Sequence, residues 1–256
     1  MPAEIQLCVF EKKFEEPSGS GYCQKLETFF RACEYTKYEV VHSTISKAPK
    51  GKLPFIILDG KQHIADSHFI IRHLIREGRI KDLDQEAGLT PVQLAESRAW
   101  QAYIEELVYP AAGWTRFAYP ENFEILKQEA FAKVPIPIRW ILIPRVKSRV
   151  KKSLIIQGVG RHSQEEVDSI IEDFVENITA RLHASNGEFF HGKSPSVIDC
   201  VMYGNLVNAL RMKSNPAYIK LILSKEILKA YIACGTRLWF PEYAGILEMV
   251  KDQADT

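Results

Sequence analysis

The first quarter of the chain alternates short apolar runs with one helical pattern of apolar positions. Ile5–Phe10 and Tyr38–Val41 are runs of strand length, and the apolar residues between positions 26 and 33 recur at i, i+3, i+4 and i+7. Phe55–Leu58 and Lys61–Ile64 provide two further strand candidates. These periods predict a βαβ unit followed by two strands and a helix.

Two turn signals organise the second pair of strands. Pro54 has no backbone donor for a sheet ladder, so it predicts that a strand begins after it. An X-Pro bond adopts the cis form at tolerable cost, and a cis Leu53-Pro54 bond would leave the backbone N–H and C=O of Leu53 available to an extended ligand. Asp59-Gly60 is a preferred dipeptide of two-residue hairpins, so we expect the two strands to pair antiparallel.

An acid-serine pair follows the hairpin. Asp66 and Ser67 stand at the entry of a predicted helix whose apolar side includes Ile70, Ile71 and Leu74. Free backbone N–H groups and two side-chain acceptors therefore meet at one point. Such a point suits the zwitterionic end of an amino acid, because amides and the hydroxyl bind its carboxylate and Asp66 binds its ammonium group.

Strand signals stop after the polar stretch Glu77–Gly88, and helical periodicity continues from Pro91. We predict a thioredoxin-like α/β domain with a mixed four-stranded sheet at 1–78, a linker at 79–90 and an all-helical domain at 91–256. Two helix starts within the last range carry capping-box spacing. They are Ser163 with Glu166 and Ser196 with Asp199.

The pre-strand proline, the hairpin and the acid-serine pair together resemble the glutathione-binding half of cytosolic glutathione transferases. The resemblance implies that Leu53, before Pro54, pairs with the backbone of the glutathione cysteine. It further implies that Asp66 and Ser67 hold the γ-glutamyl end and that Lys52 touches the peptide. Glutathione would be a co-substrate, and a homodimer is expected by the same analogy.

Nearly the whole chain resembles one branch of that superfamily. The segments PSGSGYCQKLETFFRA, SKAPKGKLPFIILDGKQHIADSHFIIRHL, GVGRHSQEEVDSI and SPSVIDCVMYG are similar to the failed-axon-connections group, which is akin to the metaxins. Metaxins are mitochondrial import components rather than established enzymes. The resemblance therefore implies either a detoxifying glutathione transferase or a non-enzymatic scaffold that binds a protein partner or a membrane surface.

Chemistry in such a fold is expected at the first helix N-terminus, where the helix dipole favours a thiolate. Ser20 stands at what resembles the catalytic position, and its hydroxyl would donate a hydrogen bond to the glutathione sulfur. Cys23 is the second candidate, because it could form a mixed disulfide, although a cysteine in this turn is also typical of plain packing. Tyr22 and Ser18 are alternative hydroxyls.

The second substrate is expected in a cleft between the domains. An aromatic wall with one cation would suit a small hydrophobic electrophile. The residues predicted for this substrate pocket are Tyr22, Tyr103, Tyr109, Trp114 and Arg116, and the alternative for each is a place in the core.

Composition limits the remaining possibilities. A chain of 256 residues accommodates two cores, and a formal net charge of +1 gives no electrostatic reason for a nucleic-acid partner. Five cysteines without regular spacing fit a reducing compartment, and no zinc-binding motif is present. The polar N-terminus predicts a cytoplasmic protein without a signal peptide.

One segment differs from an ordinary soluble transferase. No acidic residue occurs from Ala130 to Gln164, while Lys133 and seven other cations surround the apolar run Ile138–Ile143. Peripheral contact of residues 138–152 with an anionic membrane is one interpretation. An inserted helix hairpin over the substrate cleft and attraction of anionic ligands are the alternatives.

Overall fold

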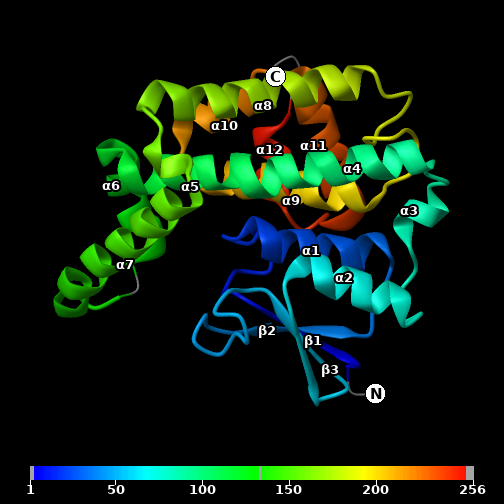
Figure 1. Cartoon of the computed structure of the whole chain (residues 1–256), viewed down its shortest axis with the longest axis horizontal. Coiled ribbons are helices and arrows are strands. Elements are labelled where there is room, and N and C mark those ends of the chain that lie inside the picture. Colours follow the sequence, from blue (N-terminus) through cyan, green and yellow to red (C-terminus); the bar gives the residue numbers. More distant parts are fainter. Residues whose placement is uncertain (1–2, 133, 252–256) are drawn as a thin grey trace.

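The structure is a computed structural model that describes residues 3–132 and 134–251. Figure 1 shows a small sheet at the bottom, two helices above it and a larger layer of helices on top. The strands are β1 (Ile5–Val9), β2 (Tyr38–His42), β3 (Phe55–Leu58) and β4 (Gln62–Ala65), in the order β2-β1-β3-β4. β1 is parallel to β2, and the other two pairs are antiparallel. The predicted mixed four-stranded sheet is confirmed.

Local chemistry explains the β3–β4 hairpin. Asp59 and Gly60 have φ of 51° and 70°, the left-handed values that a type I′ turn requires at both central positions. β3 begins directly after Pro54, at the point where the missing N–H costs the sheet nothing. Its residues Phe55, Ile56 and Leu58 are buried.

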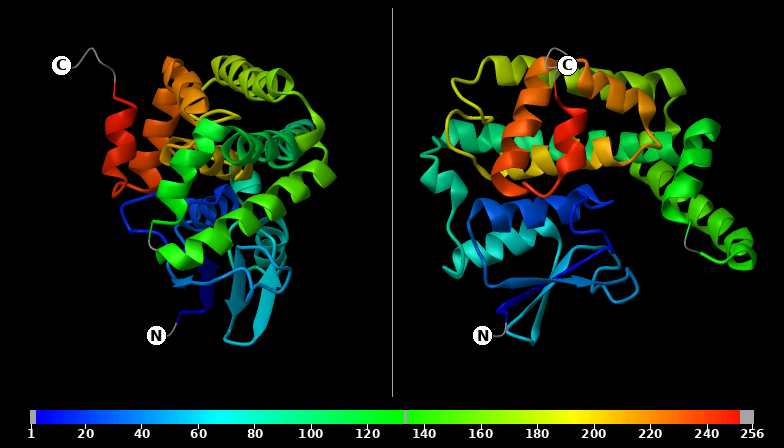
Figure 2. Two further views of the ribbon diagram at one scale, coloured as in Figure 1. Left: turned by 90° about the vertical axis from the view of Figure 1, so that its left-hand side faces the viewer. Right: turned by 180° about the vertical axis from the view of Figure 1, so that it is seen from behind.

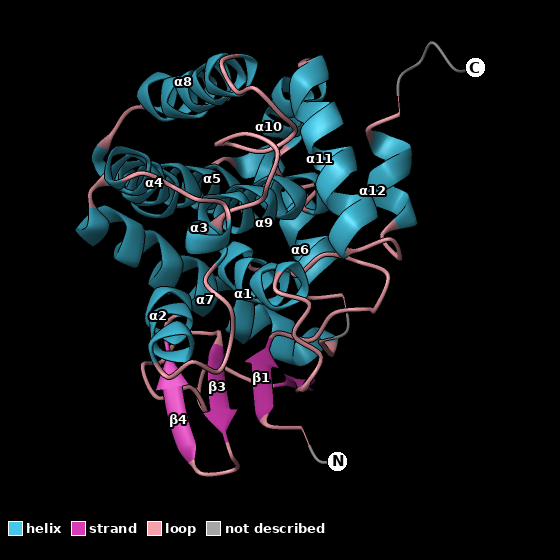
Figure 3. Ribbon diagram, turned by 90° about the vertical axis from the view of Figure 1, so that its right-hand side faces the viewer, coloured by secondary structure: helices cyan, strands magenta, loops and turns pink. Residues whose placement is uncertain are grey.

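Two helices separate the sheet from the helical layer (Figure 3). α1 (Gly21–Ala32) has Leu26, Phe29 and Phe30 fully buried. α2 (Ser67–Arg76) buries Ile70, Ile71 and Leu74. The strands, α1 and α2 therefore follow one another along the chain in the order predicted from the sequence.

The rest of the described chain is helical after the short helix α3 (Leu83–Glu86). It comprises α4 (Pro91–Tyr103), the π-helical η1 (Ile104–Val108), α5 (Tyr109–Ala118), α6 (Pro120–Ala130), α7 (Ile136–Gln157), the 3-10 helix η2 (Val159–Arg161), α8 (Gln164–His183), α9 (Val197–Arg211), α10 (Pro216–Leu223), α11 (Glu226–Trp239) and α12 (Ala244–Met249). The change to helical structure follows α2, as expected, and the domain limits at 78 and 91 stay a prediction.

Both predicted capping boxes are present. The Ser163 N–H donates to Glu166, whose own N–H donates back to the Ser163 hydroxyl. At α9 the fully buried Asp199 accepts the N–H and the hydroxyl of Ser196 at 2.9 and 2.8 Å. It also accepts the Phe190 N–H at 2.8 Å and the Tyr231 hydroxyl at 3.0 Å. Asp199 thus joins the start of α9 to the preceding loop and to α11.

The two domains meet mainly where α1 packs on α9. Gly204 makes this approach possible, because a Cβ there would lie 2.8 Å from the Lys25 backbone nitrogen and 3.1 Å from the Gly21 carbonyl oxygen. No larger residue fits without moving one helix. The relative position of the domains is therefore set by backbone contact as well as by side chains.

The acid-free segment forms the single helix α7 and not the helix hairpin that was one of the alternatives. α7 lies along α5 at one end and extends away from the helical layer at the other (Figures 1 and 2). No residue of α7 is buried. Lys133, part of the predicted basic cluster, lies outside the described residues.

Candidate functional site

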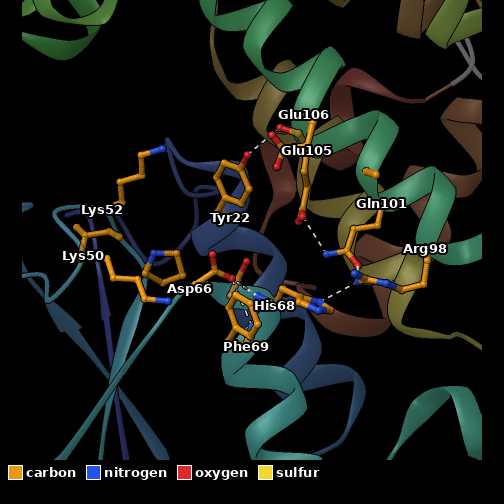
Figure 4. Close-up of a pocket in the computed structure, with 14 residues that line it drawn as sticks. Tyr22, Lys50, Lys52, Asp66, His68, Phe69, Arg98, Gln101, Glu105 and Glu106 are labelled. Carbon is orange, nitrogen blue, oxygen red and sulfur yellow. Dashed lines mark hydrogen bonds between the residues drawn. The ribbon is translucent and has the colours of Figure 1, made fainter. Parts of the chain in front are cut away.

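A pocket of about 360 Å³ opens where the sheet domain meets α4 and η1 (Figure 4). The five residues predicted to bind the peptide all line it: Lys52, Leu53, Pro54, Asp66 and Ser67. Tyr22 of α1, predicted for the substrate pocket, lines it as well. The structure brings these six residues together, and their roles stay predictions.

Leu53 offers its backbone to the pocket. The Leu53-Pro54 bond is cis, and the Leu53 side chain is 6% exposed. Within residues 3–132 and 134–251 neither its N–H nor its C=O has a hydrogen-bond partner. Both groups are therefore available to an extended ligand.

Asp66 is the N-cap of α2 and has a φ of 85°. Its Oδ1 accepts the His68 N–H at 2.9 Å and the Phe69 N–H at 3.4 Å. Oδ2 has no hydrogen bond within the described part of the chain. The adjacent Ser67 is buried at the pocket wall. One carboxylate oxygen and one hydroxyl thus remain for a ligand at the positive end of the α2 dipole.

Two lysines, Lys50 and Lys52, also line the pocket (Figure 4). The Lys50 ammonium lies 4.9 Å from the centre of the Phe69 ring, a cation–π distance. Lys52 forms no ion pair within the described residues. These cations can attract a carboxylate of a ligand in the pocket.

A chain of polar contacts forms the helical wall of the pocket. Arg98 donates to the Gln101 side-chain oxygen at 2.7 Å, and Gln101 donates to Glu105 at 2.9 Å. Glu105 in turn binds the Lys25 ammonium of α1 at 2.7 Å. Arg98 also donates to Nδ1 of His68, and burial together with the Arg98 charge lowers the pKa of that imidazole. This series of polar contacts links α1, α2 and α4 across the domain boundary.

The residues of the helical wall were not predicted, although their spacing in the sequence places them on one side of a helix. Arg98, Gln101 and Glu105 are three and four residues apart and therefore share one helical face. The π-helical turn at η1 could not be predicted from the sequence, because the helical periodicity that begins at Pro91 gives no sign of a change in helix type. Pro110 has no N–H, and the carbonyls of Glu105 and Glu106 accept side-chain donors instead, from Tyr22 at 2.9 Å and Gln157 at 2.6 Å.

Comparisons with known proteins identify the family. The family model for the glutathione S-transferase N-terminal domain matches residues 21–122. Failed axon connections of Drosophila melanogaster is 30% identical over 230 residues, which are 84% of this chain and 52% of that protein. Human metaxin-1 is 23% identical over 202 residues, which are 76% of this chain and 42% of that protein. These matches support a place for the chain in the glutathione transferase superfamily, on its failed-axon-connections and metaxin-like branch.

Solved structures confirm the fold of this superfamily. Glutathione S-transferase III in its apo form has a TM-score of 0.58 at 14% identity, with 98% of each chain covered. Glutathione S-transferase-I bound with lactoylglutathione also has a TM-score of 0.58 at 14% identity, covering 96% of this chain and all of that one. The predicted thioredoxin-like domain followed by a helical transferase domain is confirmed. The chain spans about half the length of the two relatives named above.

Ser20, at the position that resembles the transferase catalytic residue, lies outside the pocket. It is the N-cap of α1, is 5% exposed and accepts the Cys23 N–H at 3.4 Å. The Ser20 N–H donates to the Ser18 hydroxyl. Ser18, in the loop before α1, is buried as well. The catalytic role of Ser20 stays a prediction, but its hydroxyl does not face the space that Asp66 and Leu53 line.

An aromatic ring covers the N-terminus of α1. A Cβ at Gly21 would lie 3.0 Å from the Tyr109 ring, and the rings of Tyr109 and Tyr22 meet edge to face at 4.8 Å. The cavity that Tyr22, Tyr109 and Ile104 line has about 10 Å³, room for about one water molecule. Tyr109 therefore covers Gly21 at the start of α1, whereas Tyr22 in the same turn lines the pocket.

Cys23, the second catalytic candidate, is fully buried in α1. Burial raises the pKa of its thiol to about 11, although the Ser20 and Ser18 side chains favour the thiolate. The helix dipole therefore does not offset the loss of solvent. The placement corresponds to the packed cysteine that was the alternative to a reactive one.

The aromatic wall predicted for the second substrate is not part of this pocket. Tyr103 packs against Trp100 and Phe174 inside the helical domain. Trp114 packs on the same core beneath α7, and Arg116 is buried beside Asn208. These residues lie on helical faces that point into the domain. The apolar periodicity that singled them out in the sequence therefore indicates core positions. Of the five predicted residues, only Tyr22 lines the pocket.

One further cluster has a catalytic appearance. The Ser97 hydroxyl lies 2.7 Å from Nε2 of His191, and Arg181 contacts Nδ1 of the same imidazole at 3.2 Å. Arginine can only donate, so Nδ1 is the acceptor and Nε2 carries the proton that bonds Ser97. This histidine cannot take a proton from the serine, and we assign the cluster to structure. Within the described residues no group of three or more His, Cys, Asp or Glu is placed to hold a metal ion.

Proposed function

We propose that the pocket binds glutathione. The observation that supports this proposal is the convergence of Leu53, Asp66 and Ser67, which come from two separate segments, on one pocket between the domains. A γ-glutamyl end would place its ammonium group at Oδ2 of Asp66 and its carboxylate at Ser67 and the first N–H groups of α2. The free backbone of Leu53 would pair with the cysteine residue, and Lys50 or Lys52 with the glycine carboxylate.

Transferase chemistry is the finer part of the proposal. Thiolate formation needs a donor at the sulfur, and Ser20 would supply it only if Tyr109 and Tyr22 move aside. The hydroxyls that face the pocket belong to Ser67 and Tyr22, and Tyr22 already donates to the Glu105 carbonyl. Burial raises the pKa of Tyr22, so this phenol stays protonated. Conjugation to a small hydrophobic electrophile therefore remains a hypothesis that binding alone does not establish.

A non-enzymatic module is the second candidate function. It is favoured by the enclosed first turn of α1, which removes the thiol-activating position from the pocket while the peptide-binding residues stay in place. In this case glutathione would be a ligand and not a co-substrate. The homodimer and the cytoplasmic location expected from the sequence also stay predictions. None of the helices in residues 3–132 and 134–251 is long and apolar enough to cross a bilayer.

Calorimetric titration with reduced glutathione tests the binding proposal, with Asp66→Asn as the matched variant. Asparagine retains N-cap capacity and tolerates a positive φ, so α2 stays intact while the charge is lost. Loss of one charge-assisted contact weakens binding by about 10–100-fold. Absence of binding by the unmodified protein at millimolar glutathione, or equal affinity of the variant, contradicts the proposed site.

Turnover separates the two candidate functions. The protein is assayed with glutathione and 1-chloro-2,4-dinitrobenzene, alongside Ser20→Ala and Tyr22→Phe. Activity that falls in Ser20→Ala with unchanged glutathione affinity supports the transferase and the catalytic assignment of Ser20. Glutathione binding without turnover by the unmodified protein supports the non-enzymatic module.

A further inference from the structure

Helix α7 projects from the helical layer (Figure 2). It exposes large apolar side chains to solvent. Its N-terminal half carries Ile136, Ile138, Trp140 and Ile141, and Trp140 is 76% exposed. Ile155 and Ile156 are exposed near its other end. A soluble surface tolerates such residues singly, but a group of them on one helix indicates an interaction surface.

The opposite side of α7 is already used for packing. Ile143 packs on the small core beneath α6, and Leu154 approaches Gly113 of α5. The ammonium of Lys147 lies 3.9 Å from the centre of the Phe123 ring, and that of Lys151 lies 5.3 Å from the Trp114 ring. These contacts fix how α7 is rotated, so its outward face is defined.

The outward face carries a row of cations. Arg145, Arg149 and Lys152 are exposed and follow each other at four and three residues, which is one side of a helix. Ile138, Ile141 and Ile156 belong to the same side by this period. No carboxylate in the described residues forms an ion pair with these three cations, and no acidic residue occurs from Ala130 to Gln164.

We propose that α7 docks the protein on an anionic lipid bilayer. Ile138, Ile141 and Ile156 enter the boundary between headgroups and acyl chains. Arg145, Arg149 and Lys152 stay at the lipid phosphates, since their long side chains reach outward past the apolar atoms. The docking is peripheral and depends on ionic strength.

Charge decides between a bilayer and a second copy of the chain. A symmetric contact of two α7 helices through the outward face would bring both rows of cations together without any acidic residue of α7 to neutralise them. An anionic membrane offers both a negative surface for the row and an apolar layer for the isoleucines of the same face. An anionic bilayer alone therefore accounts for both the charge and the apolar residues of the outward face of α7.

Vesicle flotation of the full chain tests the proposal. Vesicles of phosphatidylcholine are compared with vesicles that also contain phosphatidylserine, at low salt and at about 1 M salt, where screening acts within about 3 Å. We expect flotation with phosphatidylserine at low salt and loss of it at high salt. Absence of flotation with anionic vesicles at low salt overturns the proposal.

Variants assign the effect to α7. Replacing Arg145, Arg149 and Lys152 by Gln is expected to lower partitioning about a hundredfold, from about fivefold per cation. The control replaces Lys61, Arg72 and Lys193 by Gln, which changes the net charge equally at exposed positions outside α7. An equal loss in both triple variants means non-specific attraction and overturns the proposal. Thermal unfolding of each variant establishes that it is folded.

A third arm tests insertion. Replacing both Ile138 and Ile141 by Ser should reduce flotation with anionic vesicles at low salt, although the net charge is unchanged. Flotation unaffected by the serine substitutions contradicts insertion of this face. Sedimentation without lipid provides the last outcome: self-association that the α7 variants abolish would assign the face to a second copy.

Discussion

The ion pair between Lys25 and Glu105 is expected to be the most sensitive electrostatic contact of the domain boundary. The Lys25 side chain is 2% exposed and that of Glu105 is 16% exposed, with 2.7 Å between Nζ and Oε1. Within the described residues Lys25 has no other carboxylate partner. Removing Glu105 leaves a desolvated ammonium group, which costs about 3–5 kcal/mol of unfolding free energy.

The magnitude is large for a protein of this size. Domains are stable by about 5–15 kcal/mol, and for a chain of this length about 4 kcal/mol lowers Tm by roughly 10 °C. Glu105→Leu should therefore be strongly destabilised in urea unfolding followed by circular dichroism. Lys25→Met should cost less, because the remaining Glu105 reaches the pocket and its solvent. The double variant should recover most of the loss, since an apolar pair can replace a buried ion pair at little cost.

A double-mutant cycle tests whether the charges of Lys25 and Glu105 are coupled. If the losses of Glu105→Leu and Lys25→Met simply add, the two charges are not coupled and the reasoning fails. Glu248→Leu provides the control, because the side chains of Glu248 and its partner Lys251 are 72% and 62% exposed and such a surface pair contributes about 0–1 kcal/mol. A similar loss in the control would show that leucine, not the broken pair, causes the destabilisation.

Three further outcomes are expected. Asp199→Ala should cost more than about 3 kcal/mol in urea unfolding, because buried donors lose their acceptor, and a loss below about 1 kcal/mol contradicts this. Gly204→Ala should cost about 1–3 kcal/mol by forcing α1 from α9, whereas Gly245→Ala, whose Cβ meets nothing within 4 Å, should be neutral. Alkylation of native Cys23, followed by mass spectrometry, should stay slow at pH 8. Because folding raises its pKa from 9.0 to about 11, this thiol should reduce stability as the pH rises through that window, and rapid native labelling at pH 8 contradicts its burial.

Local signals made the sheet domain and the peptide-binding residues predictable. Pro54, Asp59-Gly60 and Asp66 each restrict the backbone within a few residues, so their effects can be read without knowing the fold. The two capping boxes were readable for the same reason. Ser67 was indicated by its position at the entry of the α2 helix, whereas Lys52 was named only by resemblance to the transferases. Both line the one pocket.

The second half of the site was not predictable because it depends on how helices are rotated and packed. The aromatic residues Tyr103 and Trp114 lie on an apolar face, and periodicity cannot tell whether such a face lines a cleft or a core. The π-helical turn shifts the register of the helix before Tyr109, and no sequence pattern indicated this shift. Arg98 and Gln101 belong to no recognisable sequence motif. They form the polar wall of the pocket only because α4 lies next to α2 in the folded protein.

The proposed peptide binding and the proposed thiol activation would depend on different physical features of the structure. Leu53 and Asp66 need only their local turns and the α2 N-terminus, and both features are intact. Thiol activation needs open space at the first turn of α1, and there Gly21 is in contact with the Tyr109 ring while Ser20 is enclosed. Since Pro110 and the η1 turn help to hold Tyr109 in this place, access to Ser20 depends on the helical domain and not on the domain that carries Ser20.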